Sequence, residues 1–296
     1  MAYRPSASTL PPFPPLLALL SGVLAISTGA IFARLADAPA LVIAAYRVGL
    51  ATVFLAPWAW WHVRHELYGL SRRDYQLALC AGMFLAVHFA TWIASLDYTS
   101  VANSVVLVNT HPLWVGLATP FLSHDPLSRR MWISIVLSLL AGVIIGAGDI
   151  TLGAQALWGD GLAVVGGIAA AFYLLLGRRL RRTLSLLAYV MLCYGSAAGI
   201  LWAVVLVLRL PVTGFSPSTY SAFVAMALIP QIIGHSSYNW ALRWLSTSLV
   251  AVSLLGEPIG STLLAYLIFD EGLTWAKAIG GTCILGAIGL AAWEER

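Results

Sequence analysis

The sequence has 296 residues, of which 60% are hydrophobic and 9% are charged, and its mean hydropathy is +0.88. A soluble domain of this length requires a far more polar surface, so the composition predicts an all-α polytopic protein embedded in the lipid bilayer. The long, continuous apolar runs exclude a β-barrel, whose strands alternate between apolar and polar residues. The net charge of +4 does not indicate a nucleic-acid partner, because the basic residues are scattered between the apolar runs.

Ten apolar stretches are each long enough to span the bilayer as an α-helix, for which about 20 residues suffice. They lie near residues 15–35, 39–61, 75–96, 99–122, 131–148, 157–177, 184–208, 219–241, 246–269 and 274–293. The proline-rich residues 1–14 precede the first stretch without a small-residue cleavage site. We therefore expect these residues to form a disordered cytosolic tail and not a signal peptide.

The basic residues are unevenly divided between the two sides of the membrane. With a cytosolic amino terminus, twelve of the 16 Lys and Arg residues fall in cytosolic segments and three in outer segments. The remaining one, Arg47, lies inside the second stretch. This bias follows the positive-inside rule, so both termini are predicted to lie in the cytosol and the protein in the cytoplasmic (inner) membrane.

Proline interrupts two of the apolar stretches beside a polar residue. In the fourth stretch Asn109 and His111 precede Pro112, and in the ninth, 146 residues after His111, Glu257 precedes Pro258. Proline lacks a backbone N–H and disfavours helical geometry in the preceding residue, so the helix should kink at each position. Matching interrupted helices in corresponding halves of a sequence indicate the binding site of a transporter.

The two interruptions belong to a longer internal repeat. At the same offset Asp125 aligns with Glu271. The two halves, residues 15–148 and 157–293, each contain five predicted helices, and an odd number of helices inverts the second half relative to the first. The predicted fold is therefore ten transmembrane helices in a five-plus-five inverted repeat, with a substrate site near the middle of the membrane.

Polar and aromatic side chains recur at helical spacing, and so share one face, in two further stretches. In the third stretch these are His88, Thr91, Trp92 and Ser95, and in the eighth Gln231, His235, Tyr238 and Asn239. Because the two histidines hold nearly equivalent places in the two halves, we expect the faces to form opposite walls of one cavity. The alternative is that each histidine only hydrogen-bonds a neighbouring helix.

The residues predicted to bind a substrate combine these faces with the two interruptions. They are His88, Trp92, Asn109, His111, Tyr173, His235, Tyr238, Asn239 and Glu257, and the predicted hinges are Pro112 and Pro258. Glu257 could exchange protons beside a cationic ligand, or simply stabilise the kink by bonding a helix end. Arg47 could hold a substrate carboxylate, or lock helices by bonding their carbonyls, and we favour the lock.

The sequence lacks the motifs of common enzymes. His65-Glu66 is not followed by a second histidine at zinc-site spacing, and neither a Gly-Lys-Ser/Thr phosphate loop nor a Gly-x-Ser-x-Gly elbow occurs. Cys80, Cys193 and Cys283 fall in three different stretches and suggest neither a disulfide nor a metal site. We expect a protein that is not an enzyme and that needs no metal and no cofactor.

Short segments repeat a common pattern in the two halves. Ala94-x-Leu96-x-Tyr98-Thr99-Ser100 leads to Pro112 and to Asp125-Pro126-Leu127-Ser128, and Ala241-Leu242 leads to Glu257-Pro258 and to Asp270-Glu271-Gly272-Leu273-Thr274. The pattern covers essentially the whole chain and resembles the EamA-type family of the drug/metabolite transporter superfamily, nearest the bacterial amino-acid exporters of the YddG type. The resemblance implies a central cavity and export of amino acids or other metabolites. His111 departs from it, because the family often carries a small or apolar residue before the first proline.

The expected function is alternating-access export of small metabolites, foremost amino acids, because the mixture of Arg, His, Glu, Asn and Tyr suits a zwitterionic or uncharged substrate. One alternative is a proton-coupled exporter of drugs or other metabolites with the same fold. Another, from a different class, is a membrane receptor or scaffold that transports nothing. The expected partner is a small-molecule substrate. Gly142 and Gly146 fit close helix packing within a monomer, with a dimer as the alternative.

The uneven charge distribution makes the topology testable. A reporter fused after Arg296 should be active in the cytosol, and one inserted near Gly153 should be active on the outer side, because the basic segments stay inside. The measurement compares a reporter active only in the cytosol with one active only outside, each placed at both positions. An outside signal from the fusion after Arg296 would contradict ten crossings.

Overall fold

The computed structural model describes residues 10–99, 101–122, 127–146, 153–270 and 272–294, and within these ranges the chain is helical apart from short connections. Most of the predicted cytosolic tail, residues 1–9, lies outside the described residues, as do Asp125 and Glu271. No strand occurs in the described ranges. The prediction of an all-helical protein is confirmed.

The helices of the first half precede a connection at residues 147–152. They are α1 (Pro15–Ile26), α2 (Gly29–Leu35), α3 (Ala40–Tyr68), α4 (Arg72–Ser95), α5 (Val101–Val108), α6 (His111–Leu122) and α7 (Arg129–Gly146). The helices of the second half include one π-helical segment, labelled η2. They are α8 (Ala154–Arg181), α9 (Leu186–Val207), α10 (Pro217–Met226), η2 (Ala227–His235), α11 (Ser236–Ala241), α12 (Thr247–Leu254), α13 (Glu257–Phe269) and α14 (Trp275–Glu294).

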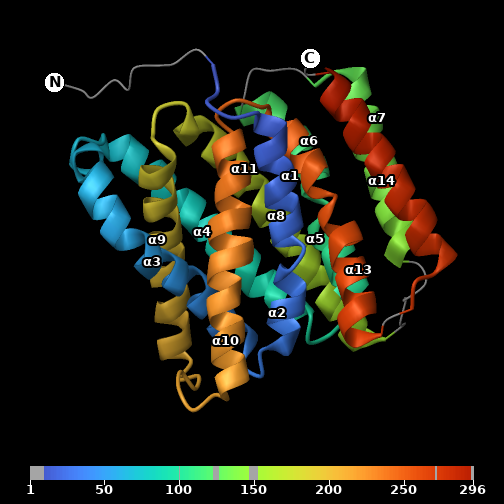
Figure 1. Ribbon diagram of the computed structural model, residues 1–296, viewed down its shortest axis with the longest axis horizontal. Helices are drawn as coiled ribbons and strands as arrows, with labels where there is room; N and C mark the ends of the chain where they lie inside the picture. The colour runs from blue at the N-terminus through green and yellow to red at the C-terminus, as the bar shows by residue number, and fades with distance from the viewer. Residues whose placement is uncertain (1–9, 100, 123–126, 147–152, 271, 295–296) are drawn as a thin grey trace.

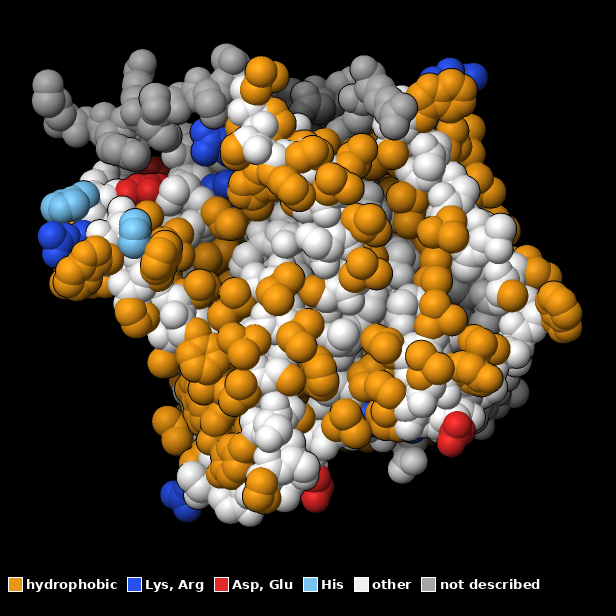
Figure 2. Space-filling model, in the orientation of Figure 1, with side chains coloured by type: hydrophobic (Ala, Val, Ile, Leu, Met, Phe, Trp, Pro, Cys, Tyr) orange, Lys and Arg blue, Asp and Glu red, His pale blue; other side chains and the backbone are white. Residues whose placement is uncertain are grey.

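Six helical stretches of the described chain are long and apolar enough to cross a membrane. They cover residues 15–35, 40–68, 72–95, 154–181, 186–207 and 247–269. The other four predicted stretches contain helices that fall short of this measure, so the count of ten crossings stays a prediction. The apolar side chains in Figure 2 cover the middle of the visible face, and charged side chains gather near its upper and lower edges. This surface is that of a multi-pass membrane protein.

Serine residues define where four of the helices begin. Ser71, Ser185, Ser216 and Ser246 each accept a hydrogen bond from the backbone N–H three residues later, at the start of α4, α9, α10 and α12. The first N–H groups of a helix have no partner inside the helix, so a serine oxygen at this position stabilises the end by about 1 kcal/mol.

The helices pack in equivalent pairs in the two halves of the chain (Figure 1). Helices at matching places contact one another, α3 with α9 and α7 with α14. α4 packs against α8, and the matching segments η2 and α11 pack against α1. α5 and α6 contact α8 in the same way that α12 and α13 contact α1. Exchanging the two halves therefore preserves the packing, as expected of a duplicated structure.

The buried apolar side chains form two separate groups. The larger group extends through α1, α3, α4, α8, α9 and η2 and contains residues such as Phe89 and Tyr194. The smaller group, which includes Ile135, Leu249 and Ile284, lies between α7, α12 and α14. The α7/α14 pair, on the right of Figure 1, is thus packed through a core of its own.

Three helices are broken near their middle. α5 ends and α6 begins around Asn109–Thr110, and α12 ends and α13 begins around Leu255–Gly256, which places Pro112 and Pro258 second in their new helices. Both breaks were predicted from the prolines. A third break, at Ser27–Thr28 between α1 and α2, and the π-helical segment η2 with Pro230 were not predicted.

Candidate functional site

A cavity lies where these irregular segments meet. It contains about 500 Å³ of empty volume, including the space at its open side. Its walls come from α1, α3, α4, α8, η2 and α11 and from the breaks between α5 and α6 and between α12 and α13. The lining residues are Ile26, Arg47, His88, Trp92, Val108, Asn109, His111, Ala170, Tyr173, Leu174, His235, Tyr238, Leu254 and Glu257.

Most of the predicted substrate-binding residues lie in this lining. Those that line the cavity are His88, Trp92, Asn109, His111, Tyr173, His235, Tyr238 and Glu257. The remaining one, Asn239, is fully buried behind the wall, where its side-chain amide donates to the hydroxyl of Tyr173. Substrate contact by the lining residues stays a prediction, and Asn239 instead supports a residue of the wall.

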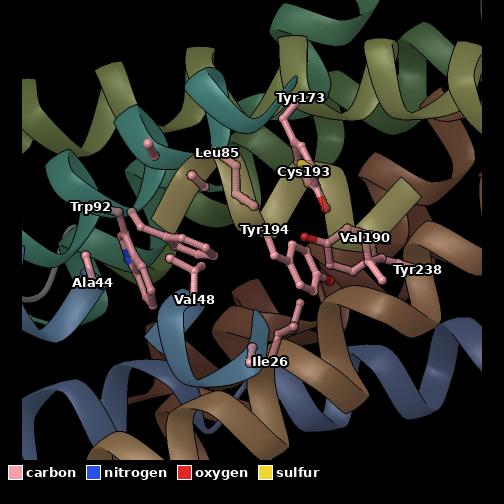
Figure 3. Close-up of a cluster of buried hydrophobic side chains, with 14 of the residues drawn as sticks. Ile26, Ala44, Val48, Leu85, Trp92, Tyr173, Val190, Cys193, Tyr194 and Tyr238 are labelled. Atoms are coloured by element: carbon pink, nitrogen blue, oxygen red, sulfur yellow. The ribbon is translucent and has the colours of Figure 1, made fainter. Parts of the chain in front are cut away.

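Tyrosines form one end of the cavity. Tyr173, Tyr194 and Tyr238 converge in Figure 3, and all three are buried. Asn239 joins two of them, since its amide also lies 3.4 Å from the hydroxyl of Tyr194. The backbone carbonyl of Asn239 accepts a hydrogen bond of 3.1 Å from Nε of the buried Arg181. A continuous set of hydrogen bonds therefore links this wall to the end of α8.

The two predicted polar faces do meet at one cavity, but only through part of their residues. The rings of His88 and His235 lie 6.4 Å apart, and Trp92 and Tyr238 flank them. Nδ1 of His88 also pairs with the carbonyl oxygen of Gly166 at 3.0 Å, so this histidine both faces the cavity and bonds a neighbouring helix.

The other members of the α4 face point elsewhere. The hydroxyl of Thr91 donates to the carbonyl of Val87 at 2.9 Å, within its own helix. The hydroxyl of Ser95 pairs with that of Ser104 at 2.6 Å. Ser95 thus joins α4 to α5, and neither Thr91 nor Ser95 lines the cavity.

Arg47 is a cation buried inside the structure, with 1% of its surface exposed. Its Nε donates to Oε1 of Gln231 at 2.8 Å, and its guanidinium lies over the ring of Phe89, 4.0 Å from the centroid. Nη1 has no hydrogen-bond partner among the described residues. A guanidinium has five N–H donors, so Arg47 keeps donor capacity. Arg47 therefore joins α3 to η2 through the carbonyl oxygen of a side-chain amide, and its role as a lock stays a prediction.

Glu257 begins α13 and contributes the carboxyl group of the cavity. Its Oε2 accepts a hydrogen bond of 3.2 Å from the side-chain amide of Asn109, which also donates to the carbonyl of Val105 at 2.8 Å. The start of a helix favours a negative charge, because the helix dipole is positive there. Thus the two predicted breaks contact each other directly, through Asn109 and Glu257.

Each break also frees a backbone carbonyl of a residue that lines the cavity. A proline cannot donate to the carbonyl four residues earlier, and for Pro112 and Pro258 those residues are Val108 and Leu254. Both line the cavity. Nδ1 of His111 lies 3.4 Å from the Val108 oxygen, while Nε2 of His111 has no partner in the described part of the chain. Both breaks therefore leave a backbone acceptor without its usual helical donor.

Two contributors to the site were not predicted from the sequence. The break at Ser27–Thr28 brings Ile26 to the cavity and Ser27 within 3.5 Å of the Glu257 carbonyl, yet no proline marks it. Gln231 was placed on the polar face of the eighth stretch, but its bond to Arg47 could not be foreseen. Only Pro230, beside it, signals the irregular helix that carries it.

The duplication seen in the packing has a counterpart in a known family. The sequence profile of the EamA-like transporter family matches residues 13–147 and, a second time, residues 157–293. The chain belongs to the EamA-like transporter family. Membership makes this protein a membrane transporter with two family repeats, as the sequence motifs predicted.

Two relatives of this EamA-like chain occur in Archaeoglobus fulgidus, and each bears the name uncharacterized transporter. One is 26% identical over 264 residues, which cover 86% of this chain and 88% of the relative. The other is 24% identical over 234 residues, covering 74% and 76%. These names support transport and specify no substrate.

A solved crystal structure shares the fold of this EamA-like protein. It covers 95% of this chain and 96% of its own with a TM-score of 0.76, at 18% sequence identity. A likeness at this identity shows the common architecture alone.

The bond between Gln231 and Arg47 predicts how substitutions of Gln231 change the stability of the folded protein. Gln231→Leu should lower the unfolding free energy by about 1.5–3 kcal/mol, because a buried cation loses its acceptor. Gln231→Glu keeps an acceptor at this place and should retain most of the stability. The measurement is thermal unfolding of the purified protein in detergent. Gln76→Leu, at an exposed position of α4, is the matched control, and equal unfolding temperatures for both leucine variants would contradict the assignment.

Proposed function

We propose that this protein exports small zwitterionic metabolites, foremost amino acids, across the cytoplasmic membrane by alternating access. The observation that carries the proposal is that Arg47 and Glu257 line one cavity and are each hydrogen-bonded to an amide, not to one another. A zwitterion brings a carboxylate and an ammonium group on one small molecule. Its two charges complement the two charges of the cavity.

The carboxylate end is assigned to Arg47. A guanidinium recognises a carboxylate through two parallel N–H donors, and such charge-assisted bonds are about twice as strong as neutral ones. The bond to Gln231 and the ring of Phe89 fix the orientation of the guanidinium. An amide leaves the positive charge of Arg47 uncompensated, so the site attracts an anion that a built-in carboxylate would exclude.

The ammonium end is assigned to Glu257 and the carbonyls released at the breaks. Asn109 engages one oxygen of Glu257, and the residues Val108 and Leu254, whose carbonyls the prolines release, line the same cavity. Interrupted helices in transporters bind ions and substrates through such freed carbonyls and helix ends. The aromatic rings of Trp92 and Tyr173 form the remaining walls and suit the side chain of the substrate.

The proposed membrane arrangement has ten crossings in two inverted halves, with both termini in the cytosol. α1 begins and α14 ends at the same end of the bundle in Figure 1, which agrees with an even number of crossings. The equivalent packing of the two halves supports a twofold relation between them. In such a protein, exchanging the shapes of the halves converts an outward-facing state into an inward-facing one.

Transport in proteoliposomes tests the substrate class. Vesicles containing the protein should carry radiolabelled amino acids from a panel faster than protein-free vesicles, with and without a pH gradient. For each amino acid carried, the matching amine without a carboxylate and the matching N-acetyl acid should move at least about tenfold more slowly, because each loses one charge-assisted bond.

Variants assign the two ends of the substrate. Arg47→Gln and Glu257→Gln should each abolish transport, and Arg34→Gln, at an exposed arginine of α2, should not. Equal amounts of folded protein are verified by thermal unfolding. Transport of amines that is independent of Arg47 would favour the alternative, an exporter of cationic compounds. Saturable binding without transport of any compound would indicate a receptor.

The two broken helices are the proposed hinges of alternating access. Replacing Pro112 or Pro258 by Ala restores a backbone donor, so the broken segments can join into a continuous helix. A bias of about 3 kcal/mol toward one facing state would leave the other below roughly 1% populated. Both variants should therefore slow transport far more than they weaken binding, and because the hinges lie in opposite repeats they should shift accessibility in opposite directions.

Cysteine labelling from each side of the membrane measures this shift. The background carries Ser in place of Cys80, Cys193 and Cys283, and one reporter cysteine is placed in the cavity wall. Pro120→Ala is the matched control, because Pro120 lies within α6 but away from the break. Identical labelling of the parent and both hinge variants would make the breaks fixed architecture.

A further inference from the structure

A second cavity adjoins the first behind the two predicted breaks. It contains about 400 Å³ of empty volume, including the space at its open side, and lies between α5, α7, α13 and α14. Asn109 lines both cavities, and Thr110, Leu255 and Pro258 bring the two breaks to the wall of the second. This space is distinct from the site assigned to the substrate.

The walls of this second cavity are largely apolar. The hydroxyl of Thr110 donates to the carbonyl of Leu107 at 2.7 Å, and that of Ser138 donates to the carbonyl of Ser134 at 2.8 Å. The amide nitrogen of Asn109 is also engaged, so the polar side chains of the lining keep only acceptors free, namely Oδ1 of Asn109 and the hydroxyl oxygens of Thr110 and Ser138. The other walls are apolar. A largely apolar lining without free side-chain donors suits an apolar occupant.

The cavity reaches the surface that faces lipid. Val143, one of its lining residues, is 63% exposed on α7, and the neighbouring Leu140 and, on α14, Leu285 are also exposed. Hydrocarbon chains surround these helices in a membrane, so an apolar occupant is available at high concentration. The space is open toward this surface, so a hydrocarbon chain can enter it directly from the surrounding lipid.

We propose that the cavity between α7, α14 and the two breaks binds the acyl chain of a membrane phospholipid. Gly142, on the wall formed by α7, lets this helix lie close to α5, because a Cβ added there would meet Val106 at 3.2 Å, and a larger side chain at this lining position would occupy part of the cavity. The acyl chain lies between the α7/α14 pair and the broken helices. Binding stabilises the arrangement of the breaks that forms the cavity, since a ligand stabilises the state to which it binds.

Photolabelling tests the proposal without any transport assay. The full-length protein in detergent is mixed with a phospholipid that carries a diazirine in its acyl chain, irradiated, and digested for mass spectrometry. We expect label on the cavity segments around Val106 and Ser138–Val143, and loss of that label when unlabelled phospholipid is added in excess. Because substrate is absent, the outcome is independent of the proposed transport function.

Three variants make the result decisive. Gly142→Leu should lose the competable label, whereas Gly286→Leu, at a glycine of α14 with open space around it, should keep it. Val143→Trp narrows the open side from an exposed position and should weaken labelling without lowering the unfolding temperature, which covers the case in which Gly142→Leu misfolds. Label that resists competition, or that equals the label on exposed residues of α9 such as Val207, would show surface lipid contact only and overturn the proposal.

Discussion

A chain inside hydrocarbon must satisfy its own backbone hydrogen bonds, and this requirement governs where the helices of this protein can be interrupted. The breaks at Ser27–Thr28, Asn109–Thr110 and Leu255–Gly256 do not face lipid separately but shelter one another. Ser27, at the first break, and Asn109, at the second, both reach Glu257, which follows the third. α8 closes over one of them, because a Cβ added at Gly167 would lie 2.7 Å from the Val108 oxygen. The segments that shield the interrupted backbone from lipid therefore also supply the polar lining of the cavity.

The charged groups of the cavity follow a related rule. A cation and an anion that are buried as a pair neutralise each other. Such a pair attracts a third, charged molecule only weakly. Here Gln231 accepts from Arg47 and Asn109 donates to Glu257, so each ionisable group is oriented by a neutral amide and not by the other. The guanidinium and the carboxyl group both line the cavity. The cavity of this EamA-like transporter is therefore not closed by an ion pair between these two residues.

The sequence predicted the helical fold, the family, the two proline breaks and most of the cavity lining, because each of these leaves a local or periodic signal. It did not predict the break at Ser27–Thr28, where no proline stands, nor the partner of Arg47, which lies 184 residues away. The position of Gln231 outside the lining has a geometric cause. The spacing of the eighth stretch was read as an α-helix, whereas the π-helical turns of η2 hold about one residue more per turn and rotate the residues before His235 relative to those after it. Gln231 consequently points at Arg47. Asn239, in the α-helical turn after His235, bonds Tyr173, so only His235 and Tyr238 of this face line the cavity.

The separate core between α7 and α14 bears on how the protein is made. α7 ends the first half of the chain and α14 ends the second, yet each is the main neighbour of the other. During synthesis α7 enters the membrane long before α14 exists, and residues 147–274 must be inserted before its inner face is covered. The first half is therefore incomplete until the last helix arrives, and a chain that loses α14 leaves Ile135 and its neighbours without the partner they pack against. Insertion of α14 is therefore a step in the folding of the first half as well as of the second.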